Sequence, residues 1–148
     1  MIKKIYLAGA MEAYKDSDKA SEWRSKVKEY FVQYALGFEC ISPVDYYSFR
    51  NNIAKNSSEI MRFDLRKVKE SDVILVNLND IRKSLGTSDE ILYAYLLGKP
   101  IVGFIDDDIE GEELANKIHT WKYAQIDRIE TGLNSILEAC EYIKDYYG

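Results

Sequence analysis

The sequence Ser84-Leu85-Gly86-Thr87-Ser88-Asp89-Glu90 leads directly into Ile91-Leu92-Tyr93-Ala94-Tyr95-Leu96-Leu97-Gly98-Lys99-Pro100. Small and polar residues come first, and an apolar helical pattern then runs to Gly98, with Pro100 two residues later, as at the end of a helix. The segment before it, Asp72-Val73-Ile74-Leu75-Val76-Asn77-Leu78, has the apolar character of a buried parallel strand. Strand, turn and helix in this order predict a βα unit whose turn offers free backbone N–H groups to a ligand.

Glu90 is expected in the first turn of this helix, at the ligand-binding edge of the sheet. The residue has two interpretations. It complements the helix dipole, as acidic residues in first turns commonly do, or it faces a ligand. This stretch by itself leaves both open.

Strand-like and helical patterns alternate on both sides of this unit. The expected strands are 3–11, 38–42, 72–78, 100–105 and a weak one at 122–126. The expected helices are one from 16 or 17 to about 35, one at 57–70, one that has Glu90 in its first turn and runs to 97, one at 112–117 and one at 131–146. Without an internal repeat or a linker, this alternation predicts one domain over residues 1–148. The fold class is α/β: three α/β/α layers around a flavodoxin-like (Rossmann-like) parallel sheet of about five strands in the order 2-1-3-4-5.

Two helices carry specific expectations about their ends and faces. Ser57 or Ser58 is expected to cap the helix at 57–70, and Met61 is expected on its inner face. Leu133 and Leu137 are expected on the inner face of the closing helix.

Cysteine and histidine usage limits the possible chemistry. Cys40 and Cys140 lie far apart within apolar patterns, which favours small core residues over metal ligands or a disulfide. His119 is the only histidine, so a Ser-His-Asp hydrolase or a His-rich zinc site is a poor fit.

Charge and hydropathy limit the possible partners. The net charge of −5 and the pI near 5.0 argue against a nucleic-acid polymer, because binding to a phosphate backbone needs a basic face. The sequence has no apolar run long enough for a membrane helix and no signal-peptide pattern. We therefore expect a cytoplasmic protein that acts on small molecules, without a membrane partner.

Two polar segments each have an ordinary and a functional interpretation. In the long connection 44–56, Tyr46, Tyr47 and Phe49 either stack on a base or pack under the loop. The acidic turn Asp106-Asp107-Asp108 lacks the glycine and the spaced oxygens of a calcium loop, so a solvated turn is favoured over a metal site.

A tyrosine and two carboxylates are candidates for the site. Ligands of such sheets bind beyond the carboxyl ends of the strands, near Tyr6 and Glu90. Asp64 falls close to the apolar face of its helix, where a carboxylate is costly unless it is functional, paired with a residue such as Arg62, or at the surface. Tyr6 either packs with its hydroxyl bonded to backbone or faces the site. One carboxylate as nucleophile and another as proton donor suffice to cleave a bond at an anomeric carbon, with no cofactor or metal.

Several short motifs together resemble the nucleoside 2-deoxyribosyltransferase family, with its relatives the 2'-deoxynucleoside 5'-monophosphate N-glycosidases. They are Ile5-Tyr6-Leu7-Ala8-Gly9, Trp23-Arg24, Asp64 ahead of Ser71-Asp72-Val73-Ile74-Leu75-Val76, and Ser84-x-Gly86-Thr87-x-x-Glu90 leading into Tyr93-Ala94 and Gly98-Lys99-Pro100. The resemblance covers most of the chain.

The resemblance implies a role for each candidate. Glu90 takes the position of the nucleophile that attacks C1′, Tyr6 that of the residue which orients and tunes it, and Asp64 that of the acid near base and sugar. The implied substrate-binding residues are Gly9, Ser84, Gly86, Thr87 and Asn116. Asn116 lies roughly where transferases send an asparagine across a subunit interface to the sugar 5'-hydroxyl, which implies a homo-oligomer with a shared active site.

The resemblance leaves the substrate open. Ser84 matches the phosphate-binding serine of the monophosphate hydrolases, which favours a nucleotide. Ala10, Met11 and Glu12 stand where those hydrolases carry a Ser and an Arg, and Glu12 would repel a phosphate if it pointed inward, which favours a nucleoside.

We therefore expect transfer of 2-deoxyribose between nucleobases through a deoxyribosyl-glutamate ester. The alternatives are hydrolysis of 2'-deoxynucleoside 5'-monophosphates and, from a different class, a non-catalytic nucleotide-binding module.

Overall fold

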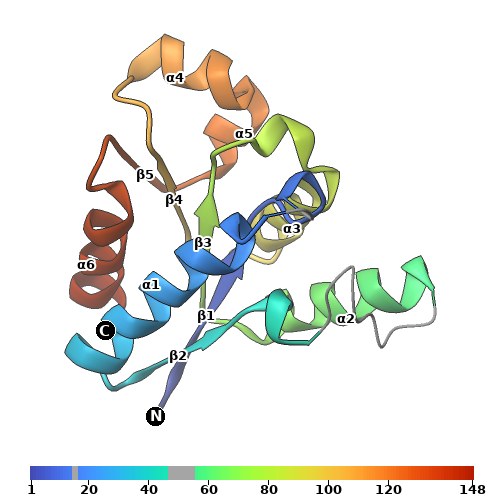
Figure 1. The fold of residues 1–148 in the computed structure, drawn as a ribbon, viewed down its shortest axis with the longest axis vertical. Helices are drawn as coiled ribbons and strands as arrows, with labels where there is room; N and C mark the ends of the chain where they lie inside the picture. The colour runs from blue at the N-terminus through green and yellow to red at the C-terminus, as the bar shows by residue number, and fades with distance from the viewer. Residues whose placement is uncertain (15–16, 47–55) are drawn as a thin grey trace.

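The computed structural model of the protein describes residues 1–14, 17–46 and 56–148, and its strands form a five-stranded parallel sheet (Figure 1). The strands are β1 (Lys3–Ala8), β2 (Phe38–Ile41), β3 (Val73–Asn77), β4 (Ile101–Ile105) and β5 (Arg128–Thr131). The helices are α1 (Lys19–Tyr34), α2 (Ser57–Glu70), α3 (Leu85–Leu96), α4 (Gly111–Ile118), α5 (Thr120–Gln125) and α6 (Ser135–Tyr147), with short 3-10 turns η1 (Glu12–Tyr14), η2 (Pro43–Asp45) and η3 (Ile81–Lys83). The order β2-β1-β3-β4-β5 confirms the predicted α/β fold and its strand order.

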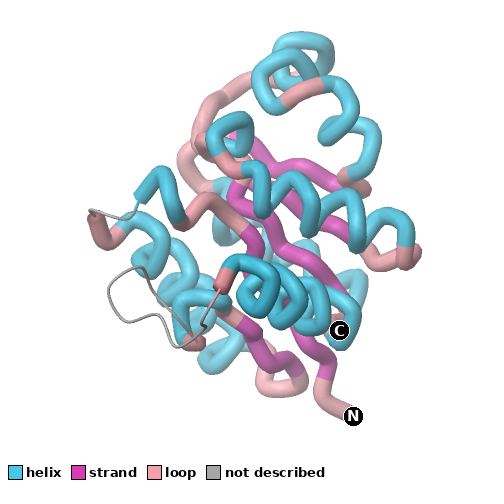
Figure 2. The backbone as a smooth tube through the Cα atoms, turned by 90° about the vertical axis from the view of Figure 1, so that its right-hand side faces the viewer, coloured by secondary structure: helices cyan, strands magenta, loops and turns pink. Residues whose placement is uncertain are grey.

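The sheet separates two apolar cores, because successive side chains of a strand point to opposite faces. Tyr6 and Ala8 of β1 belong to the core under α2, α3 and α4. Ile5 and Leu7 belong to the core under α1 and α6. Figure 2 shows the strands running between these helices. The result is the predicted arrangement of three layers.

Strands β1 and β3 lie side by side at the centre, in register from Ile5 opposite Val73 to Ala8 opposite Val76. Every residue of β3 and of β4 is buried, as their continuous apolar sequences predict. From β1 the chain passes to α1 on one face, and from β3 it passes to α3 on the other. The carboxyl ends of β1 and β3 are therefore the switch point at which open α/β sheets bind ligands.

The stretch before Glu90 is more helical than predicted. Helix α3 already begins at Leu85, and the Ser84 side chain caps it by accepting a hydrogen bond from the Thr87 N–H. Glu90 therefore lies in the second turn and not in the first. The helix ends as expected, because Gly98 adopts a φ of +70° that suits glycine.

The prediction of a strand at 122–126 is wrong. Those residues lie in or next to α5, which begins where His119, at a φ of 94°, accepts a hydrogen bond from the Trp121 N–H. The fifth strand follows at Arg128–Thr131 and pairs with β4. It is an edge strand with a polar outer row, so its sequence lacks the apolar run that identified the inner strands.

Three side chains expected on inner faces are exposed: Met61 by 54%, Leu133 by 96% and Leu137 by 52%. Leu133 lies before α6, which begins only at Ser135. The other two sit beside the buried stripes of their helices rather than on them. Helix α2 is also capped by Asn56, whose side chain accepts from the Glu59 N–H, and not by Ser57 or Ser58.

Both cysteines are free: Cys140 is buried in the core under α1 and α6, and the half-buried Cys40 packs against that core, in line with the prediction of core residues. Burial raises the pKa of the Cys40 and Cys140 thiols to about 12, so neither is a reactive thiolate at neutral pH. Within the described residues, none of the helices combines the length and the apolar character needed to cross a bilayer.

Candidate active site

Tyr6 and Glu90 meet between the sheet and helix α3. Tyr6 is fully buried on β1, and its side chain points toward the core under α3. Its hydroxyl donates a hydrogen bond to Oε2 of Glu90, which is itself only 9% exposed. The tyrosine hydroxyl therefore faces a carboxylate, and Glu90 faces inward rather than toward solvent.

The surroundings of Glu90 favour its protonated form. Burial is the main cause, and together with the nearby charges it raises the pKa of Glu90 from 4.5 to about 8. The Tyr6 hydrogen bond and the Arg24 charge lower the pKa, whereas the carboxylates of Asp64 and Asp89 raise it. A carboxyl group with such a perturbed pKa is typical of a functional site.

Asp64 lies on α2, which packs beside α3. One of its carboxylate oxygens is buried, and its charge raises the pKa of Glu90, so the two carboxyl groups are near each other. The structure thus brings together Tyr6, Asp64 and Glu90, which lie on three different elements.

Arg24 is a further buried charge, to which the sequence motif Trp23-Arg24 gave no role of its own. Its side chain is 1% exposed and donates to the carbonyl oxygens of Leu7 at 3.3 Å, Gly9 at 3.2 Å and Ala20 at 2.7 Å. The guanidinium group also lies 4.6 Å from the Trp23 ring. Arg24 ties α1 to the end of β1, and its positive charge lowers the pKa of Glu90. The sequence indicated that Arg24 is buried, because Arg24 follows Ala20 by one helical turn on the inner face of α1.

Gly9 has a packing role at the end of β1. A Cβ atom at this position would lie 2.9 Å from Cζ2 of Trp23 and 3.1 Å from Cβ of Asn77. Glycine is therefore required by the close approach of α1 and β3, independently of any ligand.

Ser84, Gly86 and Thr87 form the N-terminus of α3. The hydroxyl groups of Ser84 and Thr87 lie 2.6 Å apart, and Thr87 is 2% exposed. Gly86 is exposed, and a Cβ there would meet nothing within 4 Å. The helix N-terminus offers backbone N–H groups suited to an anion or a sugar hydroxyl, and Gly86 leaves room for a close approach.

Asn116 is separate from this group. It is exposed on α4, and its carbonyl oxygen accepts a hydrogen bond from Arg82 at 2.7 Å. Among the described residues, no interaction joins Asn116 to Tyr6, Asp64 or Glu90. At the end of β1, Ala10 is buried and presents no polar group, and the side chain of Glu12 lies outside the described part.

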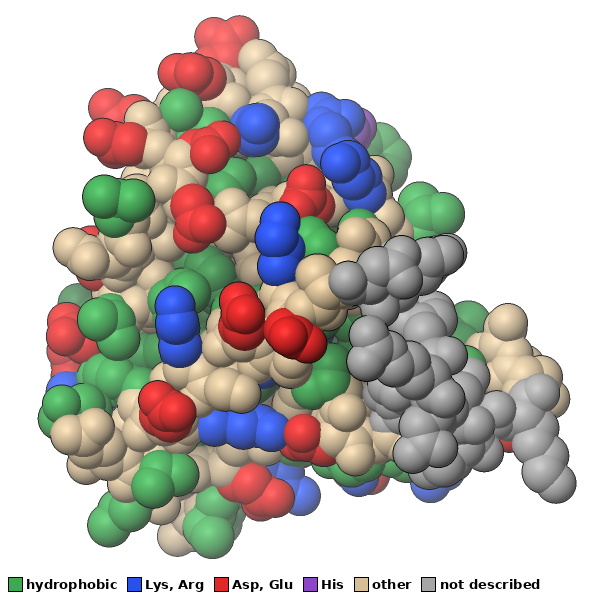
Figure 3. Space-filling view, in the orientation of Figure 1, with side chains coloured by type: hydrophobic (Ala, Val, Ile, Leu, Met, Phe, Trp, Pro, Cys, Tyr) green, Lys and Arg blue, Asp and Glu red, His purple; other side chains and the backbone are tan. Residues whose placement is uncertain are grey.

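The structure also bears on the two polar segments, 44–56 and 106–108, that each had an ordinary and a functional interpretation. The Tyr46 ring packs edge to face on Phe63 at 5.1 Å, while Tyr47 and Phe49 lie outside the described residues. The acidic turn at 106–108 is exposed, and Asp107 pairs with Lys117 at 3.4 Å. Figure 3 shows acidic side chains gathered at the α4 end of the molecule.

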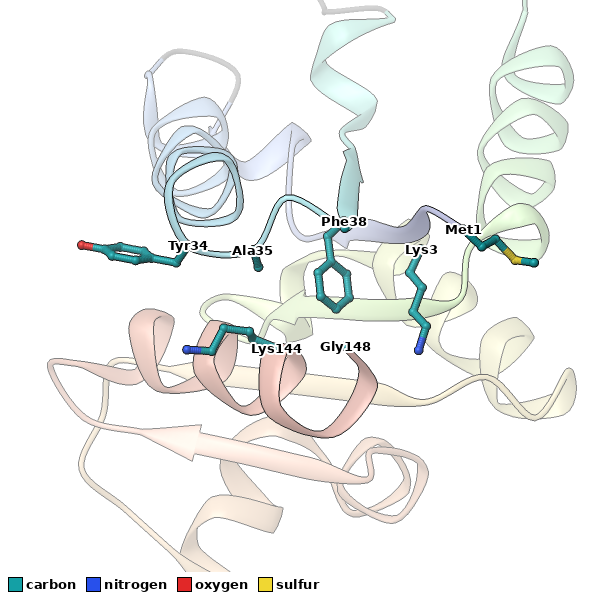
Figure 4. A pocket seen from close by; sticks show the side chains of 8 residues that line it. Met1, Lys3, Tyr34, Ala35, Phe38, Lys144 and Gly148 are labelled. Carbon is teal, nitrogen blue, oxygen red and sulfur yellow. The ribbon is translucent and has the colours of Figure 1, made fainter.

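A cavity of about 320 Å³ lies at the opposite, amino end of the sheet (Figure 4). Lys3, Phe38 and Lys144 line it, and Lys3 donates to the carbonyl oxygen of Tyr147. This cavity is remote from Glu90 and contributes nothing to the candidate site.

A family model described as nucleoside 2-deoxyribosyltransferase matches residues 5–128. The chain belongs to this family. The matched region contains Tyr6, Asp64 and Glu90. Membership supports an activity of the deoxyribosyltransferase or N-glycosidase kind in general.

Solved structures similar to this member of the nucleoside 2-deoxyribosyltransferase family share its fold at low identity. A conserved protein from Enterococcus faecalis V583 is 19% identical, with a TM-score of 0.73 over 96% of this chain and 99% of that one. The CMP N-glycosidase BcmB of Clostridium botulinum is 18% identical, with a TM-score of 0.57 over 99% and 100%. A 2-deoxyribosyltransferase from Bacillus psychrosaccharolyticus is 19% identical, with a TM-score of 0.59 over 97% and 91%. A comparison with curated protein sequences gives no significant match.

Proposed function

We propose that this protein transfers 2-deoxyribose between nucleobases through a covalent intermediate on Glu90. The observation that carries the proposal is the buried Glu90 carboxyl, which accepts a hydrogen bond from the Tyr6 hydroxyl and whose pKa is raised by the charge of Asp64 on the neighbouring helix. A nucleophile and a proton donor at one position are what cleavage of an N-glycosidic bond needs.

In the first step a Glu90 carboxylate oxygen attacks C1′ of a 2'-deoxynucleoside. The bond from C1′ to the base nitrogen breaks, and the electron pair of that bond leaves with the base. The departing base receives a proton from Asp64. The products are a deoxyribosyl-glutamate ester and a free base. Tyr6 aligns the attacking oxygen, and its hydrogen bond stabilises the ionised form that the attack requires.

In the second step a nitrogen of another base attacks C1′. The ester bond to Glu90 breaks, its electron pair returns to the carboxylate, and Asp64 takes the proton that the incoming base releases. This is a ping-pong course in which every group belongs to side chains already described.

The outer face of α3 supports a homo-oligomer. Helix α3 buries Ile91 and Ala94 against the sheet, yet Leu85, Leu92 and Leu96 on its other face are exposed by 82%, 40% and 71%. A helix that is apolar on both faces is normally covered on both. In such an assembly, Asn116 of one subunit would bind the sugar 5'-hydroxyl in the site of its neighbour.

The second candidate is hydrolysis of 2'-deoxynucleoside 5'-monophosphates. The observation in its favour is the N-terminus of α3, where the Ser84 hydroxyl and the helix dipole suit a phosphate. Against it stands Ala10, which offers no donor at the end of β1.

Chromatography after incubation with deoxynucleosides or their 5'-monophosphates, with and without a second base, tests the proposal. A new deoxynucleoside that forms only with the second base supports transfer. Free base and deoxyribose 5-phosphate from the monophosphates alone would establish the hydrolase. Absence of turnover, with nucleotide binding that survives in Glu90→Ala, would establish a binding module.

A further inference from the structure

The loops that follow β1 and β3 flank the switch point of the sheet. Tyr14 ends the 3-10 turn η1 after β1, and Asp80 lies in the connection after β3. The Tyr14 hydroxyl donates a hydrogen bond to the Asp80 carboxylate. This bond joins the two loops across the position at which sheets of this topology bind their ligands.

The Asp80 side of this bridge is firmly held. Asn79 accepts a hydrogen bond from the Asp106 N–H at 3.2 Å, which ties the loop to the end of β4. Arg82 donates to the carbonyl oxygen of Lys117 at 3.0 Å, which ties the loop to α4. Asp80 itself adopts a φ of 59°, a conformation that few side chains other than Asn and Asp tolerate.

The bridge is also connected to the helix that carries Glu90. The Lys83 N–H bonds to the Asp80 carbonyl at 2.9 Å, and the Ser84 N–H bonds to the Ile81 carbonyl at 3.0 Å. One short turn therefore links Asp80 to the cap of α3. On the other side, Tyr14 is partly buried, and burial together with Asp80 raises the pKa of its phenol, which stays protonated as the donor.

We propose that the Tyr14–Asp80 hydrogen bond is a latch that closes the switch point over the deoxyribosyl-Glu90 intermediate and keeps water from it. The proposal rests on the proposed function. Tyr14 and Asp80 are positioning residues in it, since neither touches the reacting atoms.

The latch affects which nucleophile, a base nitrogen or water, reacts with the ester. When a base nitrogen attacks C1′, the ester bond breaks toward the Glu90 carboxylate and a new deoxynucleoside forms. When water attacks C1′, the same bond breaks, free 2-deoxyribose forms, and the proton that water loses passes to Asp64. Loosening the two loops admits water without altering either carboxyl group, so hydrolysis gains over transfer.

The test measures the ratio of new deoxynucleoside to free 2-deoxyribose, using a deoxynucleoside that the wild type accepts and a second base. Tyr14→Phe removes only the hydroxyl, and we expect the ratio to fall about three- to tenfold, as for the loss of one hydrogen bond. Asp80→Asn keeps an acceptor for Tyr14 and suits the backbone, so it should retain most of the ratio. Tyr34→Phe, at an exposed tyrosine on the far end of α1, is the matched control and should leave the ratio unchanged.

An unchanged ratio in folded Tyr14→Phe overturns the latch, as does an equal change in Tyr34→Phe. If Tyr14→Phe does not fold, Asp80→Gly replaces it, because this variant removes the acceptor at a backbone position that glycine accepts. An unchanged ratio of new deoxynucleoside to free 2-deoxyribose in Asp80→Gly would then overturn the latch. A wild type that only hydrolyses also overturns the latch. A wild type with no turnover overturns the proposed function and the latch together, whereas a transferring wild type with insensitive variants overturns the latch alone.

Discussion

The Tyr6 hydroxyl donates a hydrogen bond to the Glu90 carboxylate across a separation of 84 residues, and both side chains are buried. The bond opposes the burial and the Asp64 charge, both of which raise the pKa of Glu90. Glu90 is thereby held in one orientation and close to the point at which it changes charge near neutral pH.

Replacing Glu90 with glutamine should abolish turnover, because an amide of the same shape is not a nucleophile toward C1′. We expect a loss of about three orders of magnitude or more in kcat with the fold retained, measured by release of free base and by circular dichroism. Glu141→Gln, on the exposed side of α6, should keep wild-type activity. An active Glu90→Gln would remove the covalent mechanism.

The pH dependence of kcat/KM should separate the roles of Tyr6 and Asp64. The acidic limb of the wild-type profile should rise with pH toward about 8, because attack on C1′ requires the ionised Glu90. Tyr6→Phe removes a group that lowers the pKa of Glu90, so the rise should move to higher pH. The activation barrier should also increase by about 1–3 kcal/mol, because the hydrogen bond to the nucleophile is lost. Asp64→Asn removes a group that raises the pKa, so the rise should move to lower pH while base release slows. Shifts in the same direction would contradict the arrangement.

Glu90 should also make the free energy of unfolding depend on pH. Its pKa is about 8 in the folded protein and 4.5 in the unfolded chain, so between these values only the folded state holds the proton. The wild type should therefore lose stability relative to Glu90→Gln as pH rises from about 4.5 to 8, by about 5 kcal/mol at most. Denaturant titrations of both proteins from pH 4 to 9 measure the difference. A difference in the free energy of unfolding that stays constant over this pH range would show that folding does not shift the pKa of Glu90.

Gly9 and Gly86 should respond oppositely to alanine. Gly9→Ala forces a Cβ to within 2.9 Å of Trp23, so we expect a destabilisation of about 1–3 kcal/mol. Gly86→Ala adds a methyl group in open space on a helix and should stabilise by about 0.5–1 kcal/mol. Denaturant unfolding measures both changes.

Activity assays of the stabilised Gly86→Ala then test its proposed place at the substrate. A raised KM in a more stable protein would support close approach of the substrate to Gly86. An unchanged KM would give this glycine no part in binding.

Much of the fold was predictable because the inner strands carry continuous apolar sequences. Val73–Asn77 and Ile101–Ile105 are buried on both faces, and that burial is what their composition predicts. The predicted position of the fifth strand was wrong because an edge strand such as β5 is half polar. The predicted inward orientation of Leu133 was wrong because the start of α6 depends on the preceding turn.

The candidate site was predictable to a similar degree. Residue type and motif spacing identified Tyr6, Asp64 and Glu90, but the significance of Tyr14 and Asp80 was not visible. They are an ordinary tyrosine and an ordinary turn aspartate until the loops after β1 and β3 are placed side by side.

Local hydrophobic periodicity encodes burial, so the alternation of strands and helices, the parallel sheet and the edge at which ligands bind were all predictable from the residues in order. The packing of the separate elements brings the phenol of Tyr6 on β1 into a hydrogen bond with the carboxyl of Glu90 on α3, and it brings the charge of Asp64 on α2 near them. The pKa of Glu90 depends on those distances and on burial, which arise only when separate elements pack together.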